Sequence, residues 1–335
     1  MLRLALGSLL LLAAALPARA QEVAPNEIDI PPWFTESFLD LRQDVRDVAR
    51  EGKRLMLYFG QDGCPYCKAL MQTNFSQPAI VAKTRRRFVA IALNIWGDRD
   101  VTWTDGKVRR EKELSAFLGI QFTPTLIFLD ERGKVIARLN GYYPPHRFEP
   151  VLDWVAGHME DKVALADYLR AHARDAASAA LHDEPFFMQP PLDLRRRPGG
   201  RPLAVLFETP YCSGCDELHR EGFRRPEVKA QLAKFDVARL SLLQNEEIVS
   251  PKGEKITSEK FAKALNIVYT PSIVFFDAQG REVFRIEAYL RPFHLAGSFE
   301  YVSSGAYLKQ PSFQRFLQAK AERMRERGEP VEVWK

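Results

Sequence analysis

The chain has 335 residues, of which 46% are hydrophobic, and its formal net charge is +5. This length allows two ordinary domains, and this hydrophobic content is typical of a globular protein. The basic clusters at 85–87 and 195–197 have no aromatic residues interleaved on one face, which argues against a nucleic-acid surface. We therefore expect no nucleic-acid partner.

The N-terminal segment has the layout of a secretory signal. A positive charge at Arg3 precedes a largely apolar run from 4 to 16, and Ala18-Arg19-Ala20 resembles a cleavage site before Gln21. The apolar run is shorter than the roughly 20 residues that a membrane-spanning helix needs. We therefore expect residues 1–20 to be a signal peptide. The mature protein is then periplasmic, with no stable insertion in the membrane.

The patterns that follow predict an α/β domain. An apolar stripe at helical spacing comes first and consists of Phe38, Leu41, Val45 and Val48. The expected strands are 54–59, 88–93, 125–129 and 135–139, and the expected helices include 68–71, 111–118 and 147–158. Strands and helices that alternate and end in a hairpin and a last helix predict a mixed sheet with helices on both faces.

An insertion precedes the third strand, at 98–110. Turn residues flanked by β-formers predict a hairpin there, and a second insertion at 244–258 has the same character. Trp96 and Trp103 lie beside the first insertion, where they either pack the hairpin or contact a partner.

The whole pattern occurs twice in the chain. Cys64 and Cys212 are 148 positions apart, and an offset of 147 relates Thr123-Pro124 to Thr270-Pro271. The second copy is expected to have strands or helices at 203–207, 237–242, 260–265, 272–276 and 282–286. We therefore divide the mature chain into a first domain at 21–180, a linker at 181–201 and a second domain at 202–335. Within the linker, residues 190–191 and 195–200 are expected to be exposed. Helical extensions are expected at 161–180 and 313–327.

All four cysteines belong to two closely spaced pairs, Cys64 with Cys67 and Cys212 with Cys215. Closing so short a loop would stabilise the fold little, so these pairs indicate chemistry rather than stapling. A cysteine at the start of a helix meets orphan N–H groups and the positive end of the helix dipole, which lower its pKa. We predict that Cys64 and Cys212 attack a disulfide. Their partners one turn later would resolve the mixed disulfide.

The chain resembles the thioredoxin superfamily. The residues that carry the resemblance are Cys64-Pro65-Tyr66-Cys67-Lys68, Thr123-Pro124, Cys212-Ser213-Gly214-Cys215 and Thr270-Pro271. The resemblance implies two tandem thioredoxin-like domains, a cis proline at Pro124 and Pro271, and substrate binding by these prolines together with Thr123 and Thr270. It implies no cofactor besides the cysteines. By the run Phe59-Gly60-Gln61-Asp62-Gly63-Cys64 and the long segment 97–111, the first domain is similar to periplasmic thioredoxins associated with sulfur-oxidation systems.

Departures from the family concern the proton acceptor. The buried acid that thioredoxins carry six residues before the attacking cysteine is Tyr58 in one copy and Leu206 in the other. In the second copy Glu208 either replaces it or is an exposed loop residue. His219 is interpreted as a surface or packing histidine rather than a proton shuttle.

The leading functional hypothesis is an exported thiol–disulfide oxidoreductase. The Pro-Tyr pair resembles that of glutaredoxins and favours reduction of disulfide-containing client proteins, with a transmembrane thiol transporter as the electron donor. Three alternatives stay open: an oxidant or disulfide isomerase, a zinc- or copper-carrying protein that uses its Cys-x-x-Cys pairs as ligands, and a binding module with vestigial redox pairs. The direction of electron flow is not determined by the sequence.

Overall fold

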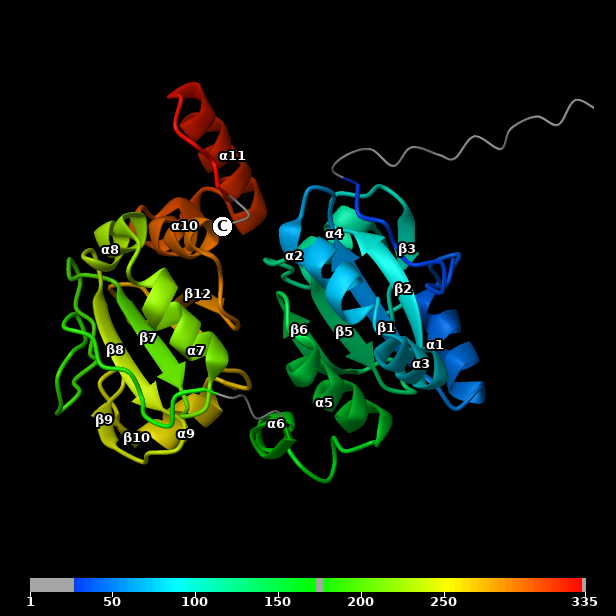
Figure 1. Cartoon of the computed structure of the whole chain (residues 1–335), viewed down its shortest axis with the longest axis horizontal. Coiled ribbons are helices and arrows are strands. Elements are labelled where there is room, and N and C mark those ends of the chain that lie inside the picture. The colour runs from blue at the N-terminus through cyan, green and yellow to red at the C-terminus, as the bar shows by residue number, and fades with distance from the viewer. Residues whose placement is uncertain (1–26, 173–176, 333–335) are drawn as a thin grey trace, which may run out of the picture.

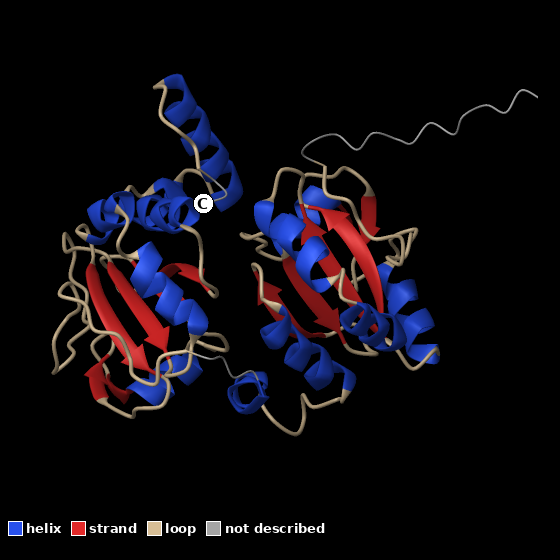
Figure 2. Cartoon of the chain, in the orientation of Figure 1, coloured by secondary structure: helices blue, strands red, loops and turns tan. Residues whose placement is uncertain are grey.

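Two four-stranded sheets organise the chain, one in each half, and helices cover both faces of each (Figures 1 and 2). The computed structural model describes residues 27–172 and 177–332, so the predicted signal peptide lies outside the described residues. Within the described part, no helix is both long enough and apolar enough to span a membrane.

The first domain has a mixed sheet with strand order β2-β1-β5-β6, in which β1 is parallel to β2 and antiparallel to β5. Its strands are β1 (Arg54–Gly60), β2 (Phe88–Asn94), β3 (Asp100–Thr102), β4 (Val108–Arg110), β5 (Thr125–Leu129) and β6 (Val135–Asn140). Its helices are α1 (Leu41–Arg50), α2 (Pro65–Ala69), the π-helix η1 (Leu70–Asn74), α3 (Pro78–Arg87), α4 (Glu111–Phe117), α5 (Pro145–Ala156) and α6 (Leu165–His172).

The core of this domain lies on both faces of β1. All seven residues of β1 are buried, as expected for a central strand with layers on either side. Because side chains alternate along a strand, Met56 and Tyr58 join the core cluster beneath α5, whereas Leu57 and Phe59 join the cluster beneath α1.

Helix α1 is shorter than its apolar stripe. Leu41, Val45 and Val48 are buried as predicted, and the Asp40 side chain caps the helix by accepting a hydrogen bond from the Gln43 N–H. Phe38 lies before this cap and is fully exposed, so its predicted place in the stripe is wrong.

The second domain repeats the first, with strand order β12-β11-β7-β8. Its strands are β7 (Leu203–Glu208), β8 (Asp236–Ser241), β9 (Glu247–Val249), β10 (Lys255–Thr257), β11 (Ser272–Phe276) and β12 (Glu282–Ile286). Its helices are α7 (Ser213–Glu217), the π-helix η2 (Leu218–Gly222), α8 (Pro226–Leu232), α9 (Ser258–Ala264), α10 (Pro292–Ser303), the 3-10 helix η3 (Ala306–Leu308) and α11 (Phe313–Glu326). The predicted α/β class and the mixed sheet in each copy are confirmed.

Both predicted hairpins form. β3 pairs with β4, and β9 pairs with β10, each in a separate two-stranded sheet. Trp103 is buried in the core beneath α1, so it packs the first hairpin, whereas Trp96 is only half-buried.

The connecting segments agree with expectation only in part. The helical pattern at 161–180 produces only α6, and the described residues 177–180 are not helical. In the linker 181–201, the residues expected to be exposed, 190–191 and 195–200, are exposed except for the partly buried Arg196. Three of the linker's apolar side chains are buried: Phe187, Leu192 and Leu194. The Met188 N–H also donates to the Val237 carbonyl at 2.8 Å, because β8 is an edge strand whose backbone groups need partners.

The two domains pack against each other about an approximate twofold relation. Asn140 and Glu287 occupy equivalent positions in the two copies, and Asn140 Nδ2 donates to Glu287 Oε2 at 2.5 Å. A contact between equivalent positions is the signature of an isologous interface. On one side of it, Phe122 packs on Phe284 and Phe313 of the second domain.

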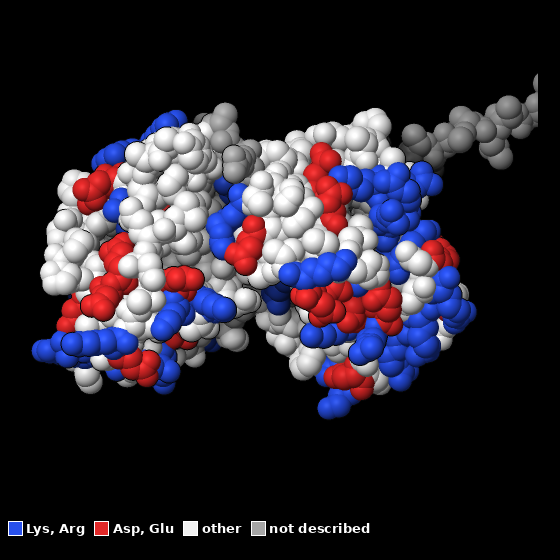
Figure 3. Space-filling view, turned by 90° about the horizontal axis from the view of Figure 1, so that it is seen from below, with Lys and Arg blue, Asp and Glu red and all other residues white. Residues whose placement is uncertain are grey.

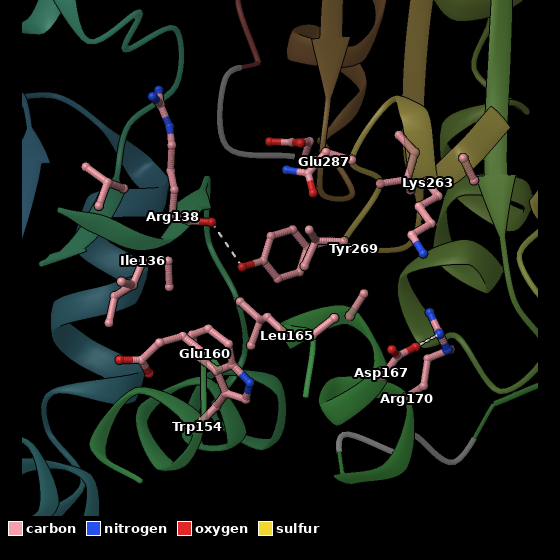
Figure 4. A pocket seen from close by; sticks show the side chains of 18 of the residues that line it. Ile136, Arg138, Trp154, Glu160, Leu165, Asp167, Arg170, Lys263, Tyr269 and Glu287 are labelled. Carbon is pink, nitrogen blue, oxygen red and sulfur yellow. Dashed lines mark hydrogen bonds and ion pairs between the residues drawn. The ribbon is translucent and has the colours of Figure 1, made fainter. Parts of the chain in front are cut away.

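On the other side, Tyr269 is the counterpart of Phe122 and joins the core of the first domain. Its hydroxyl donates to the Arg138 carbonyl at 3.0 Å, across a groove of about 1300 Å³ between the domains (Figure 4). Figure 4 also shows α6 on the floor of this groove, where Asp167 and Arg170 form an ion pair. The face seen in Figure 3 carries positive and negative side chains intermixed on both domains, and its surface is indented between them.

Candidate redox sites

Each Cys-x-x-Cys pair lies where a buried strand passes into a helix. β1 leads to Cys64 and β7 leads to Cys212, and each of these cysteines is the N-cap residue of the helix that follows, α2 or α7. Both pairs are disulfides, Cys64–Cys67 and Cys212–Cys215. The structure therefore brings together each predicted attacking cysteine with its predicted partner.

The local backbone explains why the helix begins at the first cysteine. The Cys67 N–H donates to Cys64 Sγ at 3.1 Å, and the Cys215 N–H donates to Cys212 Sγ at the same distance. In the first copy the sulfur satisfies an amide at the helix start, and in the second copy it shares the Cys215 N–H with the Cys212 carbonyl oxygen, which lies 3.0 Å away. Pro65 is the first helical residue in the first copy, where its missing N–H costs nothing.

The predicted substrate-binding loops lie beside the pairs. Thr123–Pro124 and Thr270–Pro271 are both cis peptide bonds. In the first domain the Thr123 hydroxyl donates to Cys64 Sγ at 3.3 Å, and the Thr123 carbonyl oxygen is 3.3 Å from the same sulfur. Thr123 is thus within contact distance of the attacking sulfur.

The second domain covers the first redox pair. Gln61 donates to Gln314 of α11 at 2.8 Å and to the Thr123 hydroxyl at 3.1 Å, while the Trp96 indole N–H donates to the Gln61 side-chain oxygen at 2.6 Å. Cys64 is only 4% exposed.

The residue Tyr66 between the first two cysteines is also held by the second domain. The Arg291 N–H donates to its phenol oxygen at 2.8 Å, and its ring meets that of His294 edge-on at 5.1 Å. Burial lowers the pKa of His294 to about 4, with a further lowering by Arg291, so this histidine is neutral at neutral pH.

The first domain in turn contacts the second redox site. Arg147 donates to the Thr270 carbonyl at 2.5 Å, at the cis-proline loop of the second domain. Arg147 and His294 occupy equivalent positions in the repeat, so each domain extends the same helix start toward the other domain's redox site. Sequence reasoning missed both residues, although the 147-residue offset relates them.

A buried ionisable cluster lies beneath the second pair. It consists of Glu184, Glu208 and His219, which we call the His219 cluster. His219 Nδ1 is 3.0 Å from Glu184 Oε1, and its Nε2 is 3.0 Å from Glu208 Oε1. All three side chains are buried, so the interpretations of Glu208 as an exposed loop residue and of His219 as a surface residue are wrong. Glu208 Oε2 has no partner among the described residues.

Two opposing effects set the pKa of His219. Burial lowers it, but the hydrogen bonds and charges of Glu208 and Glu184 together outweigh burial and raise the pKa above its ordinary value. His182 stacks on His219 at 4.5 Å and pairs with Asp216, the residue after Cys215. Titratable groups therefore lie on the helical segment that follows the second pair and at the end of β7, the strand that leads to it.

Among the residues that the structure describes, no such cluster is found beside the first pair. Tyr58, which stands where thioredoxins carry the buried acid, is buried, and its hydroxyl has no hydrogen-bond partner in the described part of the chain. Burial raises the pKa of Tyr58 well above its usual range, so the phenol stays protonated. In the described part of the chain, no three His, Cys, Asp or Glu residues are grouped so that they could bind a metal ion.

Comparison with known proteins identifies the family of this chain. A family model described as a thioredoxin-like domain matches residues 41–156 and again 196–303, which together are more than half of the chain. The chain belongs to the thioredoxin-like family. It contains two tandem thioredoxin-like domains, each with an oxidised Cys-x-x-Cys pair, and is a thiol–disulfide oxidoreductase.

Several solved structures are similar to one half of this thioredoxin-like chain. A thioredoxin-fold protein from Helicobacter pylori is 24% identical and covers 37% of this chain and 83% of its own, with a TM-score of 0.33. A putative disulphide-isomerase from Bacteroides thetaiotaomicron is 21% identical, covering 39% and 95%, with a TM-score of 0.30. The oxidised C-terminal domain of DsbD from Neisseria meningitidis is 19% identical, covering 34% and 89%, with a TM-score of 0.25. The search of curated proteins found no match.

Proposed function

We propose that this oxidoreductase is exported to the periplasm, where it reduces disulfides in client proteins. The N-terminal segment 1–20 supports export, because it has the charge, apolar run and small residues of a secretory signal. The Pro65-Tyr66 pair supports a reducing role, by its resemblance to the glutaredoxin motif. A reductant outside the cytoplasm needs electrons from across the membrane, so we also propose a transmembrane thiol transporter as the donor.

The observation that carries the proposal is the set of donors around Cys64 Sγ. This sulfur accepts hydrogen bonds from the Cys67 N–H at 3.1 Å and the Thr123 hydroxyl at 3.3 Å. Donors aimed at a sulfur stabilise its thiolate, and the thiolate is the nucleophile in disulfide exchange. Cys64 is therefore assigned as the attacking residue.

Reduction proceeds in two balanced steps. The Cys64 thiolate attacks one sulfur of the client disulfide, which forms a mixed disulfide and releases one client thiolate. Cys67, deprotonated, then attacks Cys64 Sγ and releases the second client thiolate, and the Cys64–Cys67 disulfide forms. Two electrons pass from the cysteine pair to the client, and the protons lost by the pair are available to the two client thiols.

A redox titration tests the direction of this reaction. We expect the Cys64–Cys67 pair, measured in a Cys212→Ser/Cys215→Ser chain, to be reducing enough to reduce insulin disulfides at a rate well above that of free dithiothreitol. Strongly oxidising potentials for both pairs, or failure of a reconstituted transmembrane thiol transporter to reduce either pair, would overturn the reductant assignment. Serine at the N-cap position 212 is expected to preserve the start of α7, because serine also caps helices.

Export is tested separately. Expression of the full chain in a bacterium, followed by fractionation and N-terminal sequencing, should give a periplasmic product that begins at Gln21. A product that keeps residues 1–20 in the cytoplasm would remove export from the proposal while leaving the thiol chemistry unaffected.

A further inference from the structure

Each cis-proline loop is bound by the opposite domain. Phe122 and Tyr269 stand directly before Thr123 and Thr270, and the 147-residue offset makes them equivalent. Phe122 is buried in the core cluster of the second domain, and Tyr269 is buried in that of the first. The two domains thus exchange equivalent aromatic side chains. Each of these side chains comes from a loop that the sequence predicts to bind substrate.

The first loop also gives polar groups to the second domain. The Gln121 carbonyl oxygen accepts a hydrogen bond from the Gln314 side chain at 2.9 Å, and the Gln121 side chain accepts one from the Phe313 N–H at 3.0 Å. The Gln121 amide group donates in turn to the Pro311 carbonyl at 3.1 Å. The first turn of α11 and the residues before it therefore bind this loop through both its backbone and its side chains.

The second loop is bound in the same manner by the first domain. The Arg147 guanidinium donates to the Thr270 carbonyl oxygen at 2.5 Å, and the Tyr269 hydroxyl donates to the Arg138 carbonyl at 3.0 Å. The ring of Tyr143 lies 4.9 Å from that of Tyr269. Thr270 directly precedes the cis proline, so Arg147 takes a backbone acceptor of the predicted substrate-binding loop.

Both predicted attacking cysteines are buried in this arrangement. The Cys64 and Cys212 side chains are almost inaccessible to solvent. The rate of thiol–disulfide exchange depends on access to the attacking sulfur. A client protein must bring its disulfide to this sulfur while its chain rests on the neighbouring cis-proline loop. In the docked arrangement, contacts from the other domain already take up groups of both loops.

The interface between the domains is built so that it can open. Several cavities and grooves, of about 480 to about 1300 Å³, have walls from both domains. Figure 4 shows Tyr269 reaching toward Arg138 across the largest of them. Water can replace the hydrogen bonds of the interface when the domains separate. Interfaces of this kind within one chain resemble transient protein interfaces, for which relative domain motion is the default expectation.

We propose that the two domains form a closed state in which each blocks the client-binding loop of the other, and that protein clients react after the domains separate. This inference rests on the proposed function, because it takes protein disulfides as the substrates. The rate with a protein client is then reduced by the fraction of molecules that are open. A small disulfide needs no space on the loop, so its rate depends less on opening.

The contact between Asn140 and Glu287 allows this equilibrium to be shifted without a change at either redox site. Asn140→Glu places a second carboxylate against Glu287 and should favour the open state, because like charges repel at short range. Asn140→Lys places a cation there and should favour the closed state. Asn140→Glu/Glu287→Gln exchanges the amide and the carboxylate between the two positions and should restore the natural equilibrium.

Two measurements on the full chain report the outcome. Small-angle X-ray scattering should give a larger radius of gyration for Asn140→Glu than for the natural chain. With dithiothreitol as the electron source, Asn140→Glu should reduce insulin disulfides several-fold faster, and Asn140→Lys several-fold slower. The rate with bis(2-hydroxyethyl) disulfide should change little in both variants. Gln43→Glu adds the same charge at an exposed position of α1 and should leave all values unchanged.

A second variant tests opening by a different route. Phe122→Ala/Tyr269→Ala removes both exchanged aromatic side chains and should also increase the radius of gyration. It is used for scattering alone, because both residues precede predicted substrate-binding threonines. Scattering that matches the natural chain in this variant and in Asn140→Glu would show that the domains do not separate, which would overturn the inference. Equal acceleration of insulin and of the small disulfide in Asn140→Glu would also overturn it.

The failure of this inference is distinguishable from that of the proposed function. If the natural chain reduces insulin and separation of the domains leaves that rate unchanged, the inference fails and the proposed function stands. If neither the natural chain nor the open variant reduces insulin, the proposed reduction of protein disulfides fails.

Discussion

The two redox regions share a fold and a motif but differ in what lies beneath them. Below the first pair, Tyr58 presents a protonated phenol without a hydrogen-bond partner among the described residues. Below the second pair, the His219 cluster places a histidine between two carboxylates. The same sheet thus supports a mainly uncharged environment in one copy and an ionic one in the other. The two copies share the backbone geometry around the first cysteine of each pair. They differ in the ionisable side chains that lie nearby.

The regions also differ in how they are closed. Beside the first pair, Gln61 donates a hydrogen bond to Gln314 of α11, whereas Tyr211, directly before Cys212 of the second pair, is exposed. Equivalent positions, Arg147 and His294, reach across the interface with different chemistry, one as a cation and one as a neutral ring. The following predictions test these differences between the two redox sites.

The largest expected effect is on the His219 cluster. His219→Leu leaves two buried carboxylates without their shared partner, and loss of one member of a buried ion pair costs about 3–5 kcal/mol. We expect hydrogen exchange of the β7 and α7 amides to report this loss. Met71→Leu, at the equivalent position of the first domain, should cost less than about 1.5 kcal/mol.

The pH dependence of the stability of His219→Leu tests whether His219 is charged in the folded protein. Because the folded pKa of His219 is raised, its stabilising contribution is complete below its ordinary pKa and disappears as the pH rises through the folded value. The difference in stability between the natural chain and His219→Leu should therefore be larger near pH 6 than near about pH 9. A difference that grows with pH would contradict the assignment of a charged histidine.

His294 should behave in the opposite way. Its pKa is lowered from 6.5 to about 4, which corresponds to about 3 kcal/mol of stability that is present above pH 6.5 and lost as the pH falls through 4. His294→Phe keeps a ring against Tyr66 and should abolish this part of the acid sensitivity. Denaturant unfolding at a series of pH values measures it, with the exposed His172→Phe as the control. Equal acid sensitivity in both variants would show that His294 is not buried as a neutral ring.

A smaller effect is expected at the end of β1. A Cβ at Gly60 would lie 2.0 Å from the Tyr58 hydroxyl oxygen, so Gly60→Ala overpacks the first site and should cost about 1–3 kcal/mol. The second domain has Glu208 at the equivalent position and Leu206 in place of the tyrosine. Tyr58→Leu/Gly60→Ala should therefore be less destabilised than the sum of its single variants. Strict additivity in denaturant unfolding would contradict the contact.

The smallest effect concerns access to Cys64. Gln314→Ala removes two hydrogen bonds beside the first pair, the one from Gln61 and the one to the Gln121 carbonyl. Each such bond contributes about 1 kcal/mol, so alkylation of reduced Cys64 should accelerate at least a few-fold. Mass spectrometry of the alkylated peptide gives the rate. Gln318→Ala, an exposed position on the same helix, is the matched control and should change nothing.

Much of this architecture could be predicted from local pattern. The apolar run of β1, the turn residues and the two Cys-x-x-Cys spacings predicted two mixed sheets, both hairpins and the position of each pair before a helix. The predictions failed where local pattern and packing compete. Phe38 has helical spacing but lies before the Asp40 cap, and the helical pattern at 161–180 forms a helix only over α6.

By itself, the sequence determined the repeat, the fold class and the identity of the four redox cysteines, because strand periodicity, turn chemistry and cysteine spacing are local properties. Only the tertiary structure decided what surrounds those cysteines. Gln314 reaches Gln61 across 253 residues, and Arg147 reaches Thr270 across 123. The sequence pattern of one domain does not specify which face packs on the other. Burial then decides which polar residues become partners, which is how Glu208 and His219 came to form an ionic cluster beneath the second pair.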